Sequence, residues 1–401
     1  MREKYDPAKR VPIACWITDA FAMLYRATKR ERYVDFMREA EERLGIIKGS
    51  HTHGFLTTLR GFAKMAFYTE DESWMALPEK YRRMIIDNKW ESGAGDISEH
   101  FPKSHRNEIC SVADWVMLNL WSGLIFGDDS AYEKAEHVLW NAMYYGQIVT
   151  GGAGHRQLIE RGYGNDEFQE AWWCCTETFM LACREVARNV VTRRGEAYNI
   201  NFLIPGDYEI DGIKFRISTR WPGKVASVIT VKGLPEGTKL GLRIPSMIKN
   251  AREVRTVEGD ELVIRLSGDV GYTIDEHDGL YMLKYGELIL APSNYTWNGK
   301  APEDGTTVPE GYIPNAFPGV EYSIELPEKD ENGFYKFEHL PMPVWNYYEE
   351  SPDGRTSFDK VTVNVNMRFK CGVKGAVRFW PLCYNVSTLT FYVTPYMFDM
   401  E

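Results

Sequence analysis

The sequence predicts a multidomain protein of α and β structure: an N-terminal helical (α/α) toroid followed by antiparallel β-sandwich domains. Its length of 401 residues is enough for two or three ordinary domains. The hydrophobic period is helical up to about residue 195, and from Glu196 onward it changes to short alternating runs. We therefore expect a helical (α/α)-barrel domain over 1–195, a β-sandwich domain over 196–295, and a loop-rich C-terminal region with strands over 296–401.

Six segments of the N-terminal part carry apolar residues at helical spacing. Short turns join them, which is typical of helical hairpins in an array or toroid. Gly45 is a plausible C-cap for the first segment. The helices are fewer than a closed toroid requires, so we expect an incomplete barrel that lacks its N-terminal helices. The predicted helices are 12–44, 53–68, 74–88, 109–126, 130–147 and 171–193.

The second half of the chain alternates apolar and polar residues, as half-buried antiparallel strands do. Turn pairs such as Asp211-Gly212 and Pro222-Gly223 separate the runs. Residues 296–358 are rich in Gly, Pro, Asp and Glu and are predicted to be loops. The predicted strands lie within 198–204, 213–219, 225–233, 239–245, 261–267, 281–293 and 359–398.

Composition and charge exclude several classes of partner. The net charge is −10 with acids and bases intermixed and no Lys/Arg block, so nucleic acid is not expected. No run reaches the roughly 18–20 apolar residues of a membrane span. The stretch around Asp19 is typical of an amphipathic helix and not of a secretory signal, so we expect a cytoplasmic protein. The aromatic content of 13% suits stacking on sugar rings.

Cysteine usage indicates a metal site. The chain has seven cysteines, an odd number that argues against a disulfide framework. Glu108 and Cys110 precede one helix, and the adjacent Cys174 and Cys175 begin another. Three thiolates and one carboxylate make a complete tetrahedral ligand set, and sulfur ligands favour zinc. From spacing alone, an equally good interpretation is that these cysteines are small buried hydrophobic residues.

These same motifs resemble glycoside hydrolase family 127, the β-L-arabinofuranosidase family. The resemblance lies in SEHF (98–101), NEIC (107–110) and WWCC (172–175), and it extends through the strand-rich region to about residue 295. The sequence departs from the family at Thr-Glu-Thr (176–178), where Pro-Pro-Asn is common. The spacer between Glu99 and Glu108 is also shorter than in characterised members.

The resemblance implies a role for each residue of the motifs. Cys174 would be the nucleophile and also a zinc ligand, and Cys175, Cys110 and Glu108 would complete the zinc sphere. Glu99 would be the general acid/base. Metal coordination keeps a thiol deprotonated at neutral pH, so a zinc-held cysteine can replace the usual carboxylate nucleophile of a retaining glycosidase.

Four other residues are candidates for substrate binding. His51 and His53 could contact sugar hydroxyls at the mouth of the barrel, although capping or packing roles explain them as well. Trp172 and Trp173 flank the cysteine pair and could stack on a sugar ring, with core packing as the alternative.

The leading hypothesis is a zinc-dependent retaining glycoside hydrolase that acts on β-L-arabinofuranosides or related glycans. A second hypothesis is a non-catalytic carbohydrate-binding or structural protein in which zinc only joins helices. A third is a sugar lyase or epimerase on a helical toroid, which would need no thiolate nucleophile. A carbohydrate is the expected partner, membranes and nucleic acids are not, and a homo-oligomer is compatible with the sequence.

Overall fold

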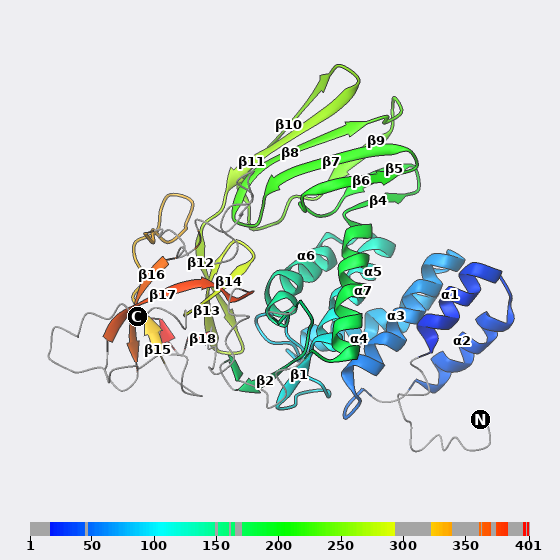
Figure 1. Cartoon of the computed structure of the whole chain (residues 1–401), viewed down its shortest axis with the longest axis horizontal. Helices are drawn as coiled ribbons and strands as arrows, with labels where there is room; N and C mark the ends of the chain where they lie inside the picture. Colours follow the sequence, from blue (N-terminus) through cyan, green and yellow to red (C-terminus); the bar gives the residue numbers. More distant parts are fainter. Residues whose placement is uncertain are drawn as a thin grey trace. The chain divides into compact units, whose positions relative to one another are not determined.

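The structure is a computed structural model. It describes residues 17–44, 47–148, 151–159, 162–164, 171–292, 322–338, 361, 363–369, 374–383, 396–397 and 399–400. The chain divides into two compact units. The first comprises Met1–Leu158 and Asp166–Val186, and the second comprises Ile159–Asn165 and Ala187–Glu401. The first unit carries the helices, coloured blue to green in Figure 1, and the second carries most of the strands.

The described part of the first unit is helical, as the sequence predicts. A 3₁₀ turn at Glu72–Met75 precedes the fourth helix, and a π-helical turn at Leu139–Met143 extends the sixth. The last helix begins in this unit and continues into the second. The α-helices are α1 (Thr18–Thr28), α2 (Arg32–Arg43), α3 (Thr52–Thr69), α4 (Ala76–Asp87), α5 (Ile109–Phe126), α6 (Asp129–Val138) and α7 (Trp173–Asn189).

The single helical segment predicted over 12–44 is wrong, because two helices occupy it. Lys29 has a φ of 52°, and its N–H bonds to the Tyr25 carbonyl, so α1 ends in a left-handed C-cap. Periodicity does not reveal such a break, because the apolar pattern continues on its far side. Gly45, the predicted C-cap, lies outside the described residues.

Helix α5 forms the centre of the first unit. Trp115 and Asp114 on this helix are fully buried, and Phe55 and Phe62 of α3 lie in the same core. The expectation that no run reaches the length of an apolar membrane span is wrong for one helix by length and composition. Among the described residues, α5 is the one helix long and apolar enough to cross a membrane, and 83% of its 18-residue window is buried inside the molecule. That burial is typical of a core helix in a globular protein. It explains why α5 is apolar on all faces.

A short strand pair in the first unit leads directly into α5. Strand β1 (Arg106–Glu108) pairs antiparallel with β2 (His155–Ile159), and Glu108 lies opposite His155. Upstream of β1, isolated bridges join Ser98 to Asn107 and His51 to His100. These pairings place the start of α3, the segment around residue 99 and the start of α5 next to one another.

The described part of the second unit consists largely of strands. Its sheets have the orders β10-β11-β8-β7-β6, β4-β5-β9 and β12-β13-β14-β17-β16-β15-β19, and β18 pairs with β13. Most neighbours are antiparallel, whereas β5–β9 and β15–β19 are parallel. The strands are β3 (Gly162–Gly164), β4 (Val191–Arg194), β5 (Ala197–Ile200), β6 (Gly206–Ile210), β7 (Ile213–Arg220), β8 (Lys224–Lys232), β9 (Lys239–Leu242), β10 (Lys249–Glu258), β11 (Glu261–Asp269), β12 (Tyr272–His277), β13 (Leu280–Tyr285), β14 (Leu288–Pro292), β15 (Tyr322–Ile324), β16 (Val363–Phe369), β17 (Lys374–Pro381), β18 (Tyr396–Met397) and β19 (Asp399–Met400).

The alternation of apolar and polar residues predicted the strands that bury one face. β7 and β8 alternate between buried and exposed residues, and the turn at Asp211-Gly212 joins β6 to β7 with positive φ at both residues, as a type I′ hairpin requires. β10 escaped prediction because nearly all of its side chains are exposed. Mixed α and β structure is therefore confirmed. Predicted strands over 387–395 lie outside the described residues.

Candidate metal-binding and active site

The predicted metal ligands lie at the beginnings of two helices. Glu108 ends β1 and is the N-cap of α5, so Cys110 is the second residue of that helix. Cys174 and Cys175 are the second and third residues of α7. A helix N-terminus carries a partial positive charge and unsatisfied N–H groups, which favour thiolates. Both helices therefore present their anion-stabilising ends to the same cluster.

The structure brings the three predicted cysteine ligands together and places the fourth, Glu108, next to one of them. The Sγ atoms of Cys110, Cys174 and Cys175 all lie within 4.8 Å of one another. Cys175 Sγ is 3.8 Å from Cys110 Sγ and 4.0 Å from Cys174 Sγ, and Cys110 Sγ is 3.5 Å from Glu108 Oε2. Residues 64 positions apart in sequence thus form a compact donor set that could hold a metal ion.

The three thiols differ in exposure and in acidity. Cys110 and Cys175 are buried, whereas Cys174 is only half-buried. Hydrogen bonds from the Cys110 and Cys175 thiols lower the pKa of Cys174, while burial raises the pKa of Cys110. Cys174 is therefore the thiol that carries negative charge most readily and the one that a ligand can reach.

Both carboxylate oxygens of Glu108 face histidines. His51 Nε2 is 2.8 Å from Oε2, and His155 Nε2 is 3.5 Å from Oε1. Burial would raise the pKa of Glu108, but the imidazoles of His155 and His51 outweigh it and hold this pKa well below its usual range. Glu108 is therefore a fixed carboxylate anion, which suits a metal ligand.

Glu99, the predicted acid/base, lies beside this carboxylate. Oxygen or nitrogen atoms of His51, Glu99 and Glu108 lie within 4.8 Å of one another. Arg106 binds Glu99 with two hydrogen bonds, Nε to Oε2 at 2.5 Å and Nη2 to Oε1 at 2.9 Å. Burial raises the pKa of Glu99, but the hydrogen bonds from Arg106 lower it overall. Glu99 is thus in the site and is held as an anion.

The second histidine, His53, is hydrogen-bonded to a buried aspartate. His53 Nδ1 is 2.6 Å from Asp114 Oδ2, which also accepts a hydrogen bond of 2.8 Å from Thr57 Oγ1. The other oxygen of Asp114 binds Arg60. Asp114 is fully buried on α5, and the other three residues lie on α3. These bonds fix His53 close to the cluster.

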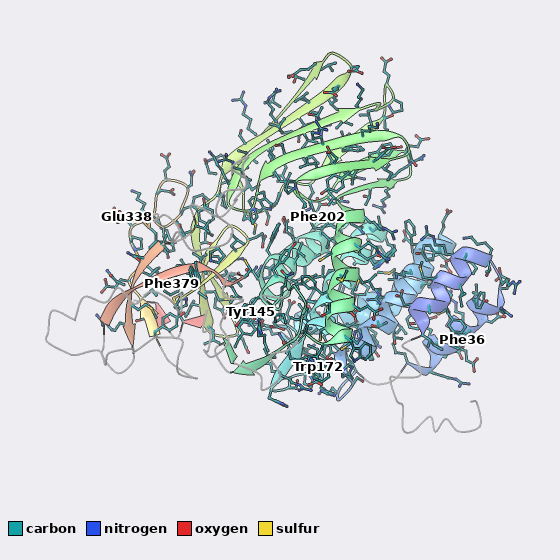
Figure 2. The ribbon with its side chains drawn as sticks, in the orientation of Figure 1. Phe36, Tyr145, Trp172, Phe202, Glu338 and Phe379 are labelled. Carbon is teal, nitrogen blue, oxygen red and sulfur yellow. The ribbon has the colours of Figure 1, made fainter. Side chains whose placement is uncertain are left out.

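The two tryptophans occupy different environments. Trp172, labelled in Figure 2, precedes α7, and its ring centroid lies 5.0 Å from that of His155. Trp173 is 75% exposed. Trp172 therefore lies beside His155, which contacts Glu108, whereas Trp173 faces solvent. Substrate contact by either ring stays a prediction.

Sequence reasoning missed two charged neighbours of the site. Arg106 was not considered, although strand-like pairing of 98 with 107 places it across from Glu99. Arg60 was hidden because a charged residue in a helical pattern is usually solvated, yet its exposure here is only 3%. Predicting these contacts from the sequence would have required knowing which segments of the chain pair with one another.

Comparison with known proteins places the fold. No protein-family model matches the chain, and no curated protein matches its sequence. A solved structure described as a glycoside hydrolase aligns with a TM-score of 0.63 and 13% identity, covering 95% of this chain and 74% of its own. A glycoside hydrolase family 127 β-arabinofuranosidase aligns at 0.60 and 13%, covering 95% and 68%. A family 127 β-L-arabinofuranosidase from Geobacillus stearothermophilus T6 aligns at 0.60 and 13%, covering 96% and 72%. The chain therefore shares the fold of family 127 glycoside hydrolases.

Proposed function

We propose that this chain is a zinc-dependent retaining glycoside hydrolase acting on β-L-arabinofuranosides or related glycans, with Cys174 as its nucleophile. The fold shared with family 127 structures supports the reaction class. The single observation that carries the proposal is the cluster of Cys110, Cys174 and Cys175, with Glu108 3.5 Å from Cys110.

Three donor–donor distances in this cluster match those of a tetrahedral zinc site. Zinc–sulfur bonds of about 2.3 Å and zinc–oxygen bonds of about 2.0–2.2 Å place two sulfurs about 3.8 Å apart and a sulfur and an oxygen about 3.5–3.7 Å apart. The sulfur–sulfur distances here are 3.8 and 4.0 Å, and the sulfur–oxygen distance is 3.5 Å. Three sulfurs with one carboxylate also favour zinc over magnesium or calcium.

Cys174 is the best placed of the three thiols to attack a sugar. It alone among the cluster cysteines is not fully buried, and its pKa is lowered by hydrogen bonds from the other two. Zinc, when bound, would keep the thiols ionised at neutral pH and hold them in place. A positioned thiolate loses less freedom at the transition state.

We propose Glu99 as the general acid/base. The Cys174 thiolate would attack the anomeric carbon, forming a carbon–sulfur bond as the carbon–oxygen bond breaks and the leaving oxygen takes a proton from Glu99. Water would then attack the same carbon, give its proton to Glu99 and release the thiolate. Two inversions give net retention. Glu99 must be protonated for the first step, so Arg106 must release one of its two bonds.

Substrate contacts and architecture complete the proposal. His51 and His53 would bind sugar hydroxyls, and Trp172 and Trp173 would supply ring faces for stacking. The helices would form part of an (α/α) toroid, and the sheets would pack as β-sandwiches over 196–295 and in 296–401. A carbohydrate is the proposed partner.

A second candidate function is carbohydrate binding without catalysis, with zinc in a purely structural role. The Arg106–Glu99 pair favours it, because a carboxylate held by a guanidinium is a poor proton donor. The two candidates differ in turnover, since only a hydrolase releases the aglycone.

The test is hydrolysis of an aryl β-L-arabinofuranoside by the zinc-loaded protein. We expect Cys174→Ala to lower kcat by at least about 10⁴-fold, because Cys110 and Cys175, the other two thiols of the cluster, are buried. Glu99→Gln should lower it by about 10²–10⁴-fold. The control is Cys183→Ala, a half-buried cysteine of α7 outside the cluster, which should leave kcat unchanged. Stoichiometric zinc without turnover on any glycoside would support the structural candidate and overturn the hydrolase.

A further inference from the structure

We infer that Asp114 is a positioning residue, which holds the His53 imidazole with its proton on Nδ1 and so presents the Nε2 edge for binding a sugar hydroxyl. The inference rests on the proposed function and deepens it, because it names the residue that gives His53 its orientation. It stands on the contacts of Asp114 of α5 with three residues of α3.

The bond between His53 and Asp114 fixes the tautomer. The distance from Nδ1 to Oδ2 is 2.6 Å, which is typical of a strong, charge-assisted bond. An ionised carboxylate can only accept hydrogen bonds, so the shared proton belongs to Nδ1. Because the two ring nitrogens lie on opposite edges of the imidazole, Nε2 faces away from Asp114.

The surroundings of Asp114 hold its carboxyl group in place. It is fully buried and accepts hydrogen bonds from Thr57 as well as His53. Arg60 binds its second oxygen and also donates a hydrogen bond of 3.1 Å to Asp19 of α1, which Lys64 contacts at 2.5 Å. Buried charges persist only when they are paired in this way. This chain of ions anchors Asp114 through Oδ1, the oxygen that does not bind His53.

His53 lies where a positioned imidazole can serve the reaction. The His53 ring is 6.2 Å from that of His51, which contacts Glu108. His53 is therefore next to the residues that surround the proposed metal ligands.

A carboxylate that orients a histidine acts through that histidine and not on the substrate. Its removal leaves the imidazole in place but frees its orientation and tautomer. Substituting a residue that orients a functional histidine commonly lowers affinity or activity by about 10–100-fold. The same magnitude is expected here in kcat/KM.

The experiment compares Asp114→Asn with Asp19→Asn on the zinc-loaded protein. Both variants remove a charge that touches Arg60, but only Asp114 touches His53. We expect Asp114→Asn to lower kcat/KM for the aryl arabinofuranoside by about 10–100-fold, and His53→Gln to do the same. The double variant should be no worse than the more affected single variant, because the two residues act as a unit. Asp19→Asn should lower thermal stability while kcat/KM stays within about threefold.

A spectroscopic readout makes the test independent of activity. In ¹⁵N-edited spectra of the histidine rings, the His53 signal, assigned by its loss in His53→Gln, should show the proton on Nδ1 in the unsubstituted protein. A His53 proton found on Nε2 alone would overturn the inference, even if Asp114→Asn failed to fold. Equal kcat/KM in Asp114→Asn and Asp19→Asn would also overturn it. An unsubstituted protein without turnover would instead overturn the proposed function, and the two failures are thus distinguishable.

Discussion

At the scale of single residues, the two neighbouring glutamates of the site contact different kinds of basic group. Glu108 faces two imidazoles, whereas Glu99 is bound by a guanidinium. Imidazoles can leave a carboxylate oxygen able to ligate a metal, but a bidentate guanidinium occupies both oxygens. Glu108 is therefore suited to a metal, and Glu99 is suited to meeting substrate once Arg106 moves.

This difference predicts separable effects on metal binding. Glu108→Gln should weaken zinc affinity at least about tenfold, because an amide is a poorer ligand than a carboxylate. Glu99→Gln, which changes a carboxyl group nearby in the same way, should leave zinc affinity unchanged. Competition with a chromogenic chelator measures both. Equal losses of affinity in the two variants would contradict the assignment of Glu108 as the ligand.

At the scale of elements, the site depends on where helices begin. The antiparallel pair of β1 and β2 ends at Glu108, and α5 starts at the next residue. Trp172 N–H bonds to the Ala153 carbonyl at 3.0 Å, which ties the start of α7 to the loop before β2. Cys110 and the Cys174–Cys175 pair thereby meet through backbone contacts that do not require a metal. The cluster geometry follows from these helix starts.

The contact between α4 and α5 predicts a pH dependence of stability. Glu79 of α4 accepts hydrogen bonds from Arg82 and Arg83 and from Ser122 of α5. Burial raises its pKa, but the bonds from Arg82 and Arg83 outweigh it and lower the pKa from 4.5 to about 2. A carboxyl group with a lowered folded-state pKa stabilises the fold above its unfolded pKa and loses that contribution as the pH falls through the folded value.

Glu79→Gln should therefore lower the melting temperature at pH 7 and flatten its fall between about pH 4.5 and 2. Thermal melts followed by circular dichroism over that range measure the effect. The control is Glu70→Gln, an exposed position that ends α3. An identical pH profile for Glu79→Gln and the unsubstituted protein would show that the bonds of Glu79 contribute nothing.

At the scale of the whole molecule, the proposed metal site joins segments that are distant in sequence. Residues 108–110 and 174–175 lie at the starts of α5 and α7. A ligand that binds only the folded chain stabilises it, by about 2.7 kcal/mol at one hundred times its dissociation constant. Zinc should therefore stabilise the first unit against unfolding.

Removing zinc with a chelator should lower the melting temperature of the helical unit, and adding zinc back should restore it. Differential scanning calorimetry follows both steps, and elemental analysis checks for one zinc per chain. Cys183→Ala should respond like the unsubstituted protein, because Cys183 lies outside the cluster. A melting temperature that is indifferent to chelation, in a protein shown to lose zinc, would contradict a stabilising role.

Local pattern predicted most elements but not the features that depend on tertiary context. Predicted helices at 53–68 and 109–126 match α3 and α5, because their apolar periodicity is long and uninterrupted. The break at Lys29 depends on one left-handed residue, and the exposed strand β10 depends on its neighbour β11 for hydrogen bonds. Neither leaves a periodic signal in the sequence.

The amino-acid sequence by itself determined the donor types of the proposed ligand set, three thiols and a carboxylate, which favour zinc only when the fold brings them together. It also determined the change from helices to strands, because hydrophobic period is a local property. Only the tertiary structure decided that Cys175 lies 3.8 Å from Cys110, that Arg106 binds Glu99, and that Asp114 holds His53. These contacts join residues on different elements, and their formation depends on how buried helices and paired strands pack, which no local pattern encodes.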